Sequence, residues 1–186
     1  MDNQHPNQRD GGHDLDTSGV SVRLTHYSRI GTLRYFDAAG AFLSSLAGVV
    51  GGPMPLALQA LRYPIGSNGG EIVLADRSPT ETLLLCTDVE QFASIERYTA
   101  LRSDGCLVDL TGGIDVWAIA GARMPDLLTR LGSITAIPAP GHAHVGRLAE
   151  LAVMSLCIRS GEILLLVERV YSRHLMAWIH ATVEDF

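Results

Sequence analysis

The C-terminal third of the chain places the strongest limits on its fold. A strand-like apolar run ends at Ile158, the turn pair Ser160-Gly161 follows, and a second apolar run covers residues 162–167. The glycine supplies the positive φ angle that a tight hairpin needs. A segment with helical spacing then places one face at Tyr171, Leu175, Trp178, Ile179 and Thr182. This unit predicts two antiparallel strands followed by a helix that packs on them.

An earlier segment repeats this plan. Residues 71–75 and 81–86 predict a hairpin that turns at Ser78-Pro79-Thr80, and a helix is expected over residues 89–101. A helix is also expected over residues 36–49, because Ala39, Phe42, Leu43 and Leu46 share one helical face.

A second segment with the same plan lies between these two. Residues 106–111 and 115–120 predict a hairpin across Gly112-Gly113, followed by a helix over residues 124–131. Strands and helices alternate without long strand–helix–strand crossovers. We therefore predict an α+β fold with a largely antiparallel sheet, built from repeated strand–strand–helix units.

Length and composition indicate one globular domain. The chain has 186 residues, 47% of them hydrophobic, which suffices for one core. Residues 1–19 contain almost no apolar side chain beyond Leu15, so burial there cannot offset the entropy of ordering. We predict a disordered polar tail over residues 1–19 and a single domain over residues 20–186.

Charge and hydropathy disfavour two classes of partner. The net charge is −6 and no cluster of lysine or arginine is present, which argues against nucleic-acid binding. The only long apolar stretch, residues 46–61, is interrupted by glycines and prolines, and the tail lacks the apolar core of a signal peptide. A cytoplasmic protein that binds neither nucleic acid nor membrane is expected.

Motifs for cofactor chemistry are missing from the sequence. It contains no Gly-x-Gly-x-x-Gly fingerprint, no phosphate-binding loop and no Gly-x-Ser-x-Gly nucleophile elbow. A flavin or nicotinamide would have to be held by another chain. No catalytic, cofactor-binding or metal-binding residue is therefore assigned.

Two pairs of histidines could in principle bind a metal ion. His142 and His144 alternate on an extended segment, but a zinc site needs three or four ligands and no cysteine or acid lies close by. His174 and His180 are six residues apart on the last helix and point in different directions. We expect no metal site at either pair.

Asp109 and Asp115 flank the Gly112-Gly113 turn. They could form an acid/base pair, but carboxylates near turns usually accept hydrogen bonds from backbone N–H groups, and we favour that structural role. The cysteines Cys86, Cys106 and Cys157 are distant from one another in strand-like runs, which predicts buried, reduced thiols.

The C-terminal unit resembles the end of the sarcosine oxidase gamma subunit family. That family has a Pro-Gly segment leading to an Arg-Leu-Ala strand start, a strand reading Leu-Leu-Val-x-Arg-Ser-Tyr, and a closing helix with a central tryptophan. The corresponding elements here are Pro140-Gly141, Arg147-Leu148-Ala149, residues 165–171 with Val170 in place of the serine, and Trp178.

Upstream of this unit, the matching motifs follow in the same order as in the family. Residues 108–111 read Val-Asp-Leu-Thr where the family has Val-Asp-x-Ser, and a strand, Gly121 and a Leu-Leu helix follow. The family hairpin Leu-x-Pro-Asp-Glu-Trp-Leu-Leu retains only its proline and one acid, at Pro79 and Glu81. The resemblance covers about residues 33–186 and indicates a divergent member.

The resemblance implies a fold like a trimmed folate-binding aminomethyltransferase and an accessory role in a heterotetramer. The alpha, beta and delta subunits would carry FAD, FMN, NAD and tetrahydrofolate. They would oxidatively demethylate sarcosine or a related N-methyl amino acid and transfer the one-carbon unit to tetrahydrofolate. The alternative is a stand-alone folate-binding protein of the aminomethyltransferase superfamily.

A few residues are candidates for a partner interface. Arg147, Arg169 and Tyr171 lie at matched positions of the C-terminal unit, although solvated strand ends explain single charges equally well. Trp117 fits either the core or an interface, because tryptophan is enriched in both, whereas Trp178 is expected in the core.

Overall fold

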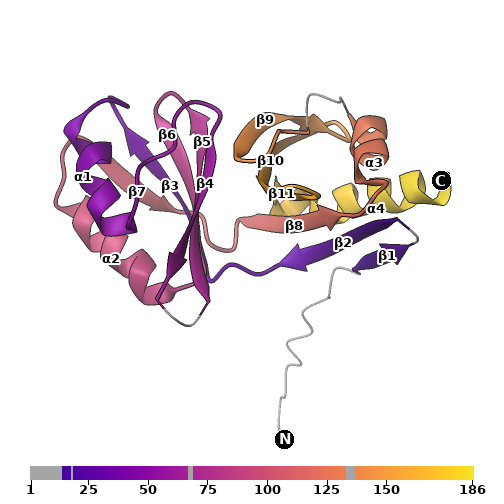
Figure 1. The fold of residues 1–186 in the computed structure, drawn as a ribbon, viewed down its shortest axis with the longest axis horizontal. Coiled ribbons are helices and arrows are strands. Elements are labelled where there is room, and N and C mark those ends of the chain that lie inside the picture. Colours follow the sequence, from indigo (N-terminus) through magenta and orange to yellow (C-terminus); the bar gives the residue numbers. More distant parts are fainter. Residues whose placement is uncertain (1–13, 18, 67–68, 133–136) are drawn as a thin grey trace, which may run out of the picture.

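The computed structural model describes residues 14–17, 19–66, 69–132 and 137–186. These residues form two antiparallel β-sheets with helices on their outer sides (Figure 1). The six-stranded sheet has the order β1 (Leu15–Thr17), β2 (Val20–Thr25), β8 (Ile114–Ala120), β11 (Glu162–Glu168), β10 (Leu151–Arg159) and β9 (His142–Leu148). The five-stranded sheet has the order β4 (Ala60–Ile65), β5 (Gly70–Ser78), β6 (Glu81–Cys86), β3 (Arg29–Tyr35) and β7 (Gly105–Asp109).

Each sheet has its own pair of helices. The five-stranded sheet packs against α1 (Ala41–Val50) and α2 (Val89–Ala100). The six-stranded sheet packs against α3 (Met124–Leu131) and α4 (Ser172–Glu184), and the short 3-10 helix η2 (Arg169–Tyr171) precedes α4. The predicted α+β class with antiparallel pairing is confirmed, and the sheet is divided into two.

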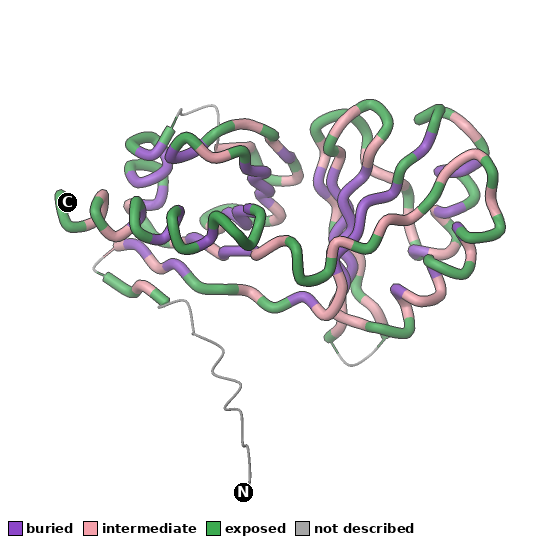
Figure 2. The backbone as a smooth tube through the Cα atoms, turned by 180° about the vertical axis from the view of Figure 1, so that it is seen from behind, coloured by how far each residue is buried: buried purple, intermediate pink, exposed green. Residues whose placement is uncertain are grey.

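The central strands explain this layered arrangement, because successive side chains of a strand point to opposite faces. In β5, Ile72 and Leu74 pack with α1 and α2, whereas Val73 and Ala75 face the other sheet. In β11, Ile163, Leu165 and Val167 pack with α3 and α4, whereas Leu164 and Leu166 meet the five-stranded sheet. Strands buried on both sides read as continuous apolar runs, and Figure 2 shows this burial along them.

Two of the three predicted hairpins form. β5 pairs with β6 and β10 pairs with β11, both antiparallel. The predicted hairpin across Gly112-Gly113 is wrong: β7 pairs with β3, whereas β8 pairs with β2 and β11. Gly113 N does donate a hydrogen bond to Leu110 O at 2.9 Å and so closes a turn. After this turn, however, the chain enters the six-stranded sheet as β8 and does not pair with β7. A glycine pair signals a turn, but it does not select the pairing partner.

An additional hairpin joins β9 and β10. Leu148 pairs with Leu151, so the loop consists of Ala149 and Glu150 alone. Their φ angles are 48° and 65°, the left-handed backbone of a type I′ turn. Such turns usually contain asparagine or glycine, and neither is present to mark this one.

The predicted tail ends too late. Leu15–Thr17 form β1, which pairs with β2 in the register Leu15↔Val22, and Leu15 packs against the core of the six-stranded sheet. Residues 1–13 and 18 lie outside the described residues. The helix expected over residues 36–49 begins later, at Ala41, and leaves Phe36 85% exposed, whereas Phe42, Leu43 and Leu46 are buried as predicted.

Backbone hydrogen bonds join the two sheets along one edge. Ala60 N donates to Gly141 O at 2.9 Å, and Ala143 N donates to Leu58 O at 2.7 Å. These bonds connect the start of β4 to the start of β9 and set the relative position of the sheets there. No helix in the described part of the chain is long and apolar enough to span a membrane.

Gly121 should tolerate substitution less well than Gly161. Both glycines have positive φ, at 115° and 86°, but a Cβ at Gly121 would overlap the carbonyl of Gly19, whereas nothing lies within 4 Å at Gly161. We expect Gly161→Ala to cost about 1–2 kcal/mol of the free energy of unfolding from backbone strain. Gly121→Ala should cost at least about 2 kcal/mol more, because the strand after Gly19 must also move.

Urea unfolding of both variants beside the parent chain measures the difference. Equal losses for the two substitutions would contradict the close packing of residues 19–20 against Gly121.

Candidate functional site

The two tryptophans lie in different environments: Trp117 is buried and Trp178 is exposed. Trp117, on β8, is only 2% exposed, and its Nε1 donates to Ser172 Oγ at 2.9 Å. It is a core residue that fixes the start of α4 and is not accessible to a partner, so it leaves the set of interface candidates. Trp178 is 49% exposed, and the expectation that it lies in the core is wrong.

Helical geometry explains the position of Trp178. Leu175 and Ile179 form the buried row of α4. Because an α-helix turns by about 100° per residue, Met176 and Trp178 lie on opposite sides of this row. Met176 joins the cluster that contains the α3 leucines. Trp178 is on the uncovered side, where its Nε1 donates to His174 Nε2 at 3.1 Å.

The outer face of α4 carries hardly any charge. We use the name α4 outer face for the exposed uncharged residues of this region, counting histidine as neutral: Val170, Tyr171, His174, Ala177, Trp178 and Ala181. Arg173 is the one exposed Asp, Glu, Lys or Arg between residues 170 and 181, all of which are described. The solvent side of an amphipathic helix is normally charged or strongly polar. An uncharged side with a tryptophan and a tyrosine is typical of a protein contact surface.

Arg147 and Arg169, the two arginines predicted for a partner interface, lie far apart on the six-stranded sheet. Arg169 Nε donates to Asp115 Oδ1 at 2.9 Å, which attaches η2 to β8 beside the α4 outer face. Arg147 is in β9, three strand steps from β8, and pairs with Glu150 across the β9–β10 turn. With about 4.8 Å per step, the structure does not bring Arg147 to Arg169 and Tyr171.

The structure assigns Asp109 and Asp115 to separate roles. Asp109 Oδ1 accepts a hydrogen bond from the backbone N–H of Thr111 at 2.7 Å, which confirms the structural interpretation for this residue. Asp115 pairs instead with Arg169, in the other sheet. The two carboxylates therefore form no acid/base pair.

Within the described ranges, the cysteines and histidines form no common site. Cys86 and Cys157 are buried, and burial raises the pKa of both thiols. Cys106 is exposed on the edge strand β7, so the expectation of burial is wrong for it. Among the residues with described positions, no group of three or more His, Cys, Asp or Glu is placed to hold a metal ion.

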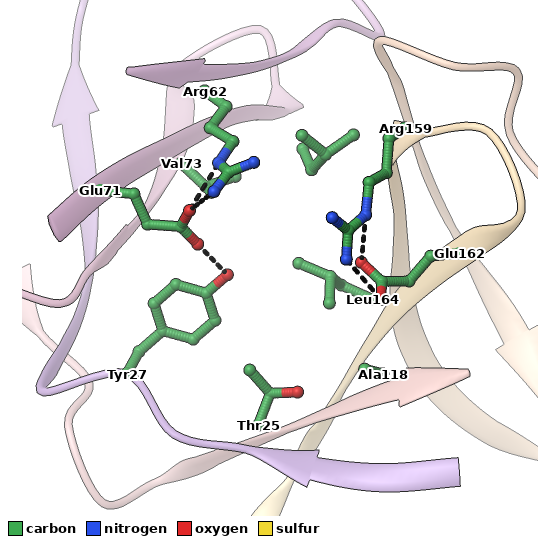
Figure 3. Close-up of a pocket in the computed structure, with 10 residues that line it drawn as sticks. Thr25, Tyr27, Arg62, Glu71, Val73, Ala118, Arg159, Glu162 and Leu164 are labelled. Atoms are coloured by element: carbon green, nitrogen blue, oxygen red, sulfur yellow. Dashed lines mark hydrogen bonds and ion pairs between the residues drawn. The ribbon is translucent and has the colours of Figure 1, made fainter. Parts of the chain in front are cut away.

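A polar pocket opens between the two sheets. One wall carries Tyr27, Arg62 and Glu71, and the other carries Arg159 and Glu162 (Figure 3). The rest of the lining is Thr25 and four apolar side chains, namely Val73, Ala118, Ile158 and Leu164. The volume is about 180 Å³. Sequence reasoning missed this site, because its residues come from five separate segments and carry no shared motif.

Each wall of the pocket contains an ion pair. Arg62 Nε donates to Glu71 Oε2 at 2.5 Å, and Tyr27 Oη donates to Glu71 Oε1 at 3.1 Å. On the other wall, Arg159 donates from Nε and Nη2 to the two oxygens of Glu162, at 3.1 and 3.0 Å.

The electrostatics of the pocket follow from these contacts. Burial raises the pKa of Tyr27 strongly, and the Glu71 carboxylate raises it further, so the phenol stays protonated and donates to Glu71. Hydrogen bonds to Glu162 raise the pKa of the Arg159 guanidinium. Each wall is therefore internally neutral.

Comparison with known proteins shows the fold. No protein-family model and no curated protein sequence matches the chain. A chain of the heterotetrameric sarcosine oxidase from Corynebacterium sp. U-96, in complex with pyrrole 2-carboxylate, has a similar structure, with a TM-score of 0.79 and 16% identity. The match covers 93% of this chain and 88% of that one. The two chains thus share a fold over nearly their whole lengths.

A second solved structure has the same fold within a longer chain. The aminomethyltransferase T of the glycine cleavage system from Bartonella henselae matches with a TM-score of 0.65 and 11% identity. The alignment covers 87% of this chain and 45% of the other. The expected likeness to a trimmed aminomethyltransferase fold is confirmed at the level of architecture.

Tyr27→Phe tests the electrostatics of the pocket. Loss of the hydrogen bond to Glu71 should lower the free energy of unfolding by about 1–2 kcal/mol near neutral pH. The folded-state pKa of Tyr27 is raised, so its contribution is complete below the ordinary tyrosine pKa of about 10 and is lost as the pH rises further. The difference between parent and variant should therefore shrink above about pH 10.

Urea unfolding at about pH 7 and about pH 10.5 measures this trend. Tyr171→Phe, at an exposed tyrosine, is the control and should change stability by less than about 0.5 kcal/mol at neutral pH. A parent–variant difference that grows with pH would contradict the assigned hydrogen bond.

Proposed function

We propose that this chain is an accessory, non-catalytic subunit of a heteromeric flavin-dependent oxidoreductase related to heterotetrameric sarcosine oxidase. The observation that carries the proposal is the α4 outer face, whose Tyr171, His174 and Trp178 are exposed in the described part of the chain. The fold supports it, since one structural neighbour of similar length is a chain of a heterotetrameric enzyme.

Under this proposal, partner subunits equivalent to alpha, beta and delta carry FAD, FMN, NAD and tetrahydrofolate. They oxidise sarcosine or a related N-methyl amino acid and transfer the one-carbon unit to tetrahydrofolate. The present chain contributes to assembly. The lack of dinucleotide and phosphate-binding motifs in its sequence agrees with this division of labour.

The α4 outer face suits the centre of a permanent contact. Hot-spot residues are enriched in tryptophan and tyrosine and lie in the desolvated middle of an interface. Here Val170, Tyr171 and Trp178 supply apolar area, while Arg169 and Arg173 lie at its margin. Permanent interfaces commonly bury about 2,000 Å² or more, so we expect the chain to be more stable in the complex than alone.

The stand-alone folate-binding alternative has less support. Pockets for ligands of drug size usually enclose about 300–1,000 Å³. The inter-sheet pocket encloses about 180 Å³ and is lined by two arginine–glutamate pairs, with no aromatic side chain besides Tyr27. We therefore retain the accessory-subunit proposal.

Substitution on the α4 outer face should weaken assembly without unfolding the chain. Trp178→Ala should weaken association by about 2 kcal/mol or more, roughly 30-fold. The apparent melting temperature of the variant should stay close to that of the parent, since half of the Trp178 side chain is already exposed. Phe36→Ala is the matched control, because Phe36 is an exposed aromatic residue preceding α1, on the five-stranded sheet's side of the molecule.

The direct experiment is purification of the tagged chain from its native host under mild conditions, with a visible spectrum of the product. The expected result is a yellow complex with larger subunits. Its yield should fall with Trp178→Ala and stay unchanged with Phe36→Ala. A colourless, stable, monomeric chain that associates with no flavoprotein would reject the proposal and make folate titration the next measurement.

A further inference from the structure

The inter-sheet pocket contains unused hydrogen-bond donors that face one another. Arg62 contacts Glu71 through Nε and Nη2, and Arg159 contacts Glu162 through the corresponding nitrogens. The Nη1 atom of each guanidinium has no partner among the described residues. Figure 3 shows one nitrogen of each arginine directed into the space between the walls, away from its glutamate.

Among the described side chains, no polar contact connects the two walls of the pocket. No hydrogen bond or ion pair between described side chains joins Tyr27, Arg62 or Glu71 to Arg159 or Glu162. The arginines come from different sheets, and their side chains are 50% and 65% exposed, so both are accessible from solvent. A group placed between them would receive donors from both sheets at once.

The guanidinium donors that face this space favour binding of an oxyanion. A guanidinium presents N–H donors in a planar fork that matches carboxylate and phosphate oxygens. The volume of about 180 Å³ corresponds to roughly six water molecules, which limits the ligand to a small molecule. The apolar lining of Val73, Ala118, Ile158 and Leu164 favours a ligand with a short hydrocarbon part over inorganic phosphate.

We propose that this pocket is a binding site for a small aliphatic carboxylate, whose oxygens bridge Arg62 and Arg159 while its hydrocarbon part lies on the apolar lining. Bound in this way, the carboxylate links the five-stranded sheet to the six-stranded sheet. None of the lining residues belongs to the α4 outer face, so the two sites can be tested separately.

Three substitutions test the proposal, because removing a glutamate charge and removing an arginine charge should change binding in opposite directions. Glu162 occupies the Nε edge of Arg159 and competes with an incoming carboxylate for the guanidinium. Glu162→Gln should therefore tighten binding several-fold, because the competing charge is removed. Arg159→Gln and Arg62→Gln should each weaken binding about tenfold or more, because each loses a charge-assisted hydrogen bond. General damage to the pocket would weaken binding in all three variants.

The measurement is titration of the ¹⁵N-labelled full chain with sodium butyrate at constant ionic strength, following the Arg Nε–H signals. Both Nε–H groups are hydrogen-bonded to glutamate, which favours their detection. Thermal shifts recorded in parallel give a readout that does not need resolved spectra. Butyramide, the uncharged isostere, should not bind, and Arg147→Gln, at an exposed ion-paired arginine outside the pocket, should bind like the parent.

Each outcome of the titration supports or overturns a stated part of the proposal. Saturable shifts with butyrate that follow the predicted order of the variants support the site. Equal binding of inorganic phosphate and butyrate would overturn the part assigned to the apolar lining and leave a general anion site. No saturable response to butyrate, or weaker binding in Glu162→Gln, would overturn the proposal.

Discussion

Apolar packing between the two sheets is the contact on which the rest of the structure depends. Val73 and Leu85 of the five-stranded sheet share a buried cluster with Leu156 and Leu166 of the six-stranded sheet. The opposite face of each sheet is covered by its own helices, so the central strands are buried on both sides. Where this inter-sheet cluster reaches Tyr27 and Glu162, charged pairs replace aliphatic side chains and a small polar pocket remains. The pocket therefore lies where apolar packing between the two sheets gives way to charged pairs.

The same packing decides what the last helix presents to solvent. α4 must bury Leu175 and Ile179 on the six-stranded sheet, and the hydrogen bond from Trp117 to Ser172 fixes where the helix begins. With its start and its buried row set, the helix has no freedom to turn Trp178 inward. An aromatic, uncharged outer face is left on the molecule, in a fold shared with one chain of a heterotetrameric enzyme.

Prediction from the sequence succeeded where the signal is local. The helix at residues 124–131 follows from a 3.6-residue period, and the β5–β6 and β10–β11 hairpins follow from apolar runs around short turns. The β9–β10 hairpin was missed because its turn uses Ala149 and Glu150 in place of glycine. The pocket was invisible because Arg62 and Arg159 are almost a hundred positions apart and meet only across two sheets.

By itself the sequence determined the helices, the β5–β6 and β10–β11 hairpins, the antiparallel α+β class and the resemblance of the C-terminal unit. Side-chain periods and turn residues act within a few positions of the chain, which is why these features could be predicted. Tertiary structure alone decided that β7 leaves β8 for β3, that Trp117 is buried while Trp178 is exposed, and that two arginines face one pocket. The physical reason is that strand pairing and burial depend on which apolar faces find each other. Several faces of similar hydrophobicity compete, and only packing of the whole chain selects among them.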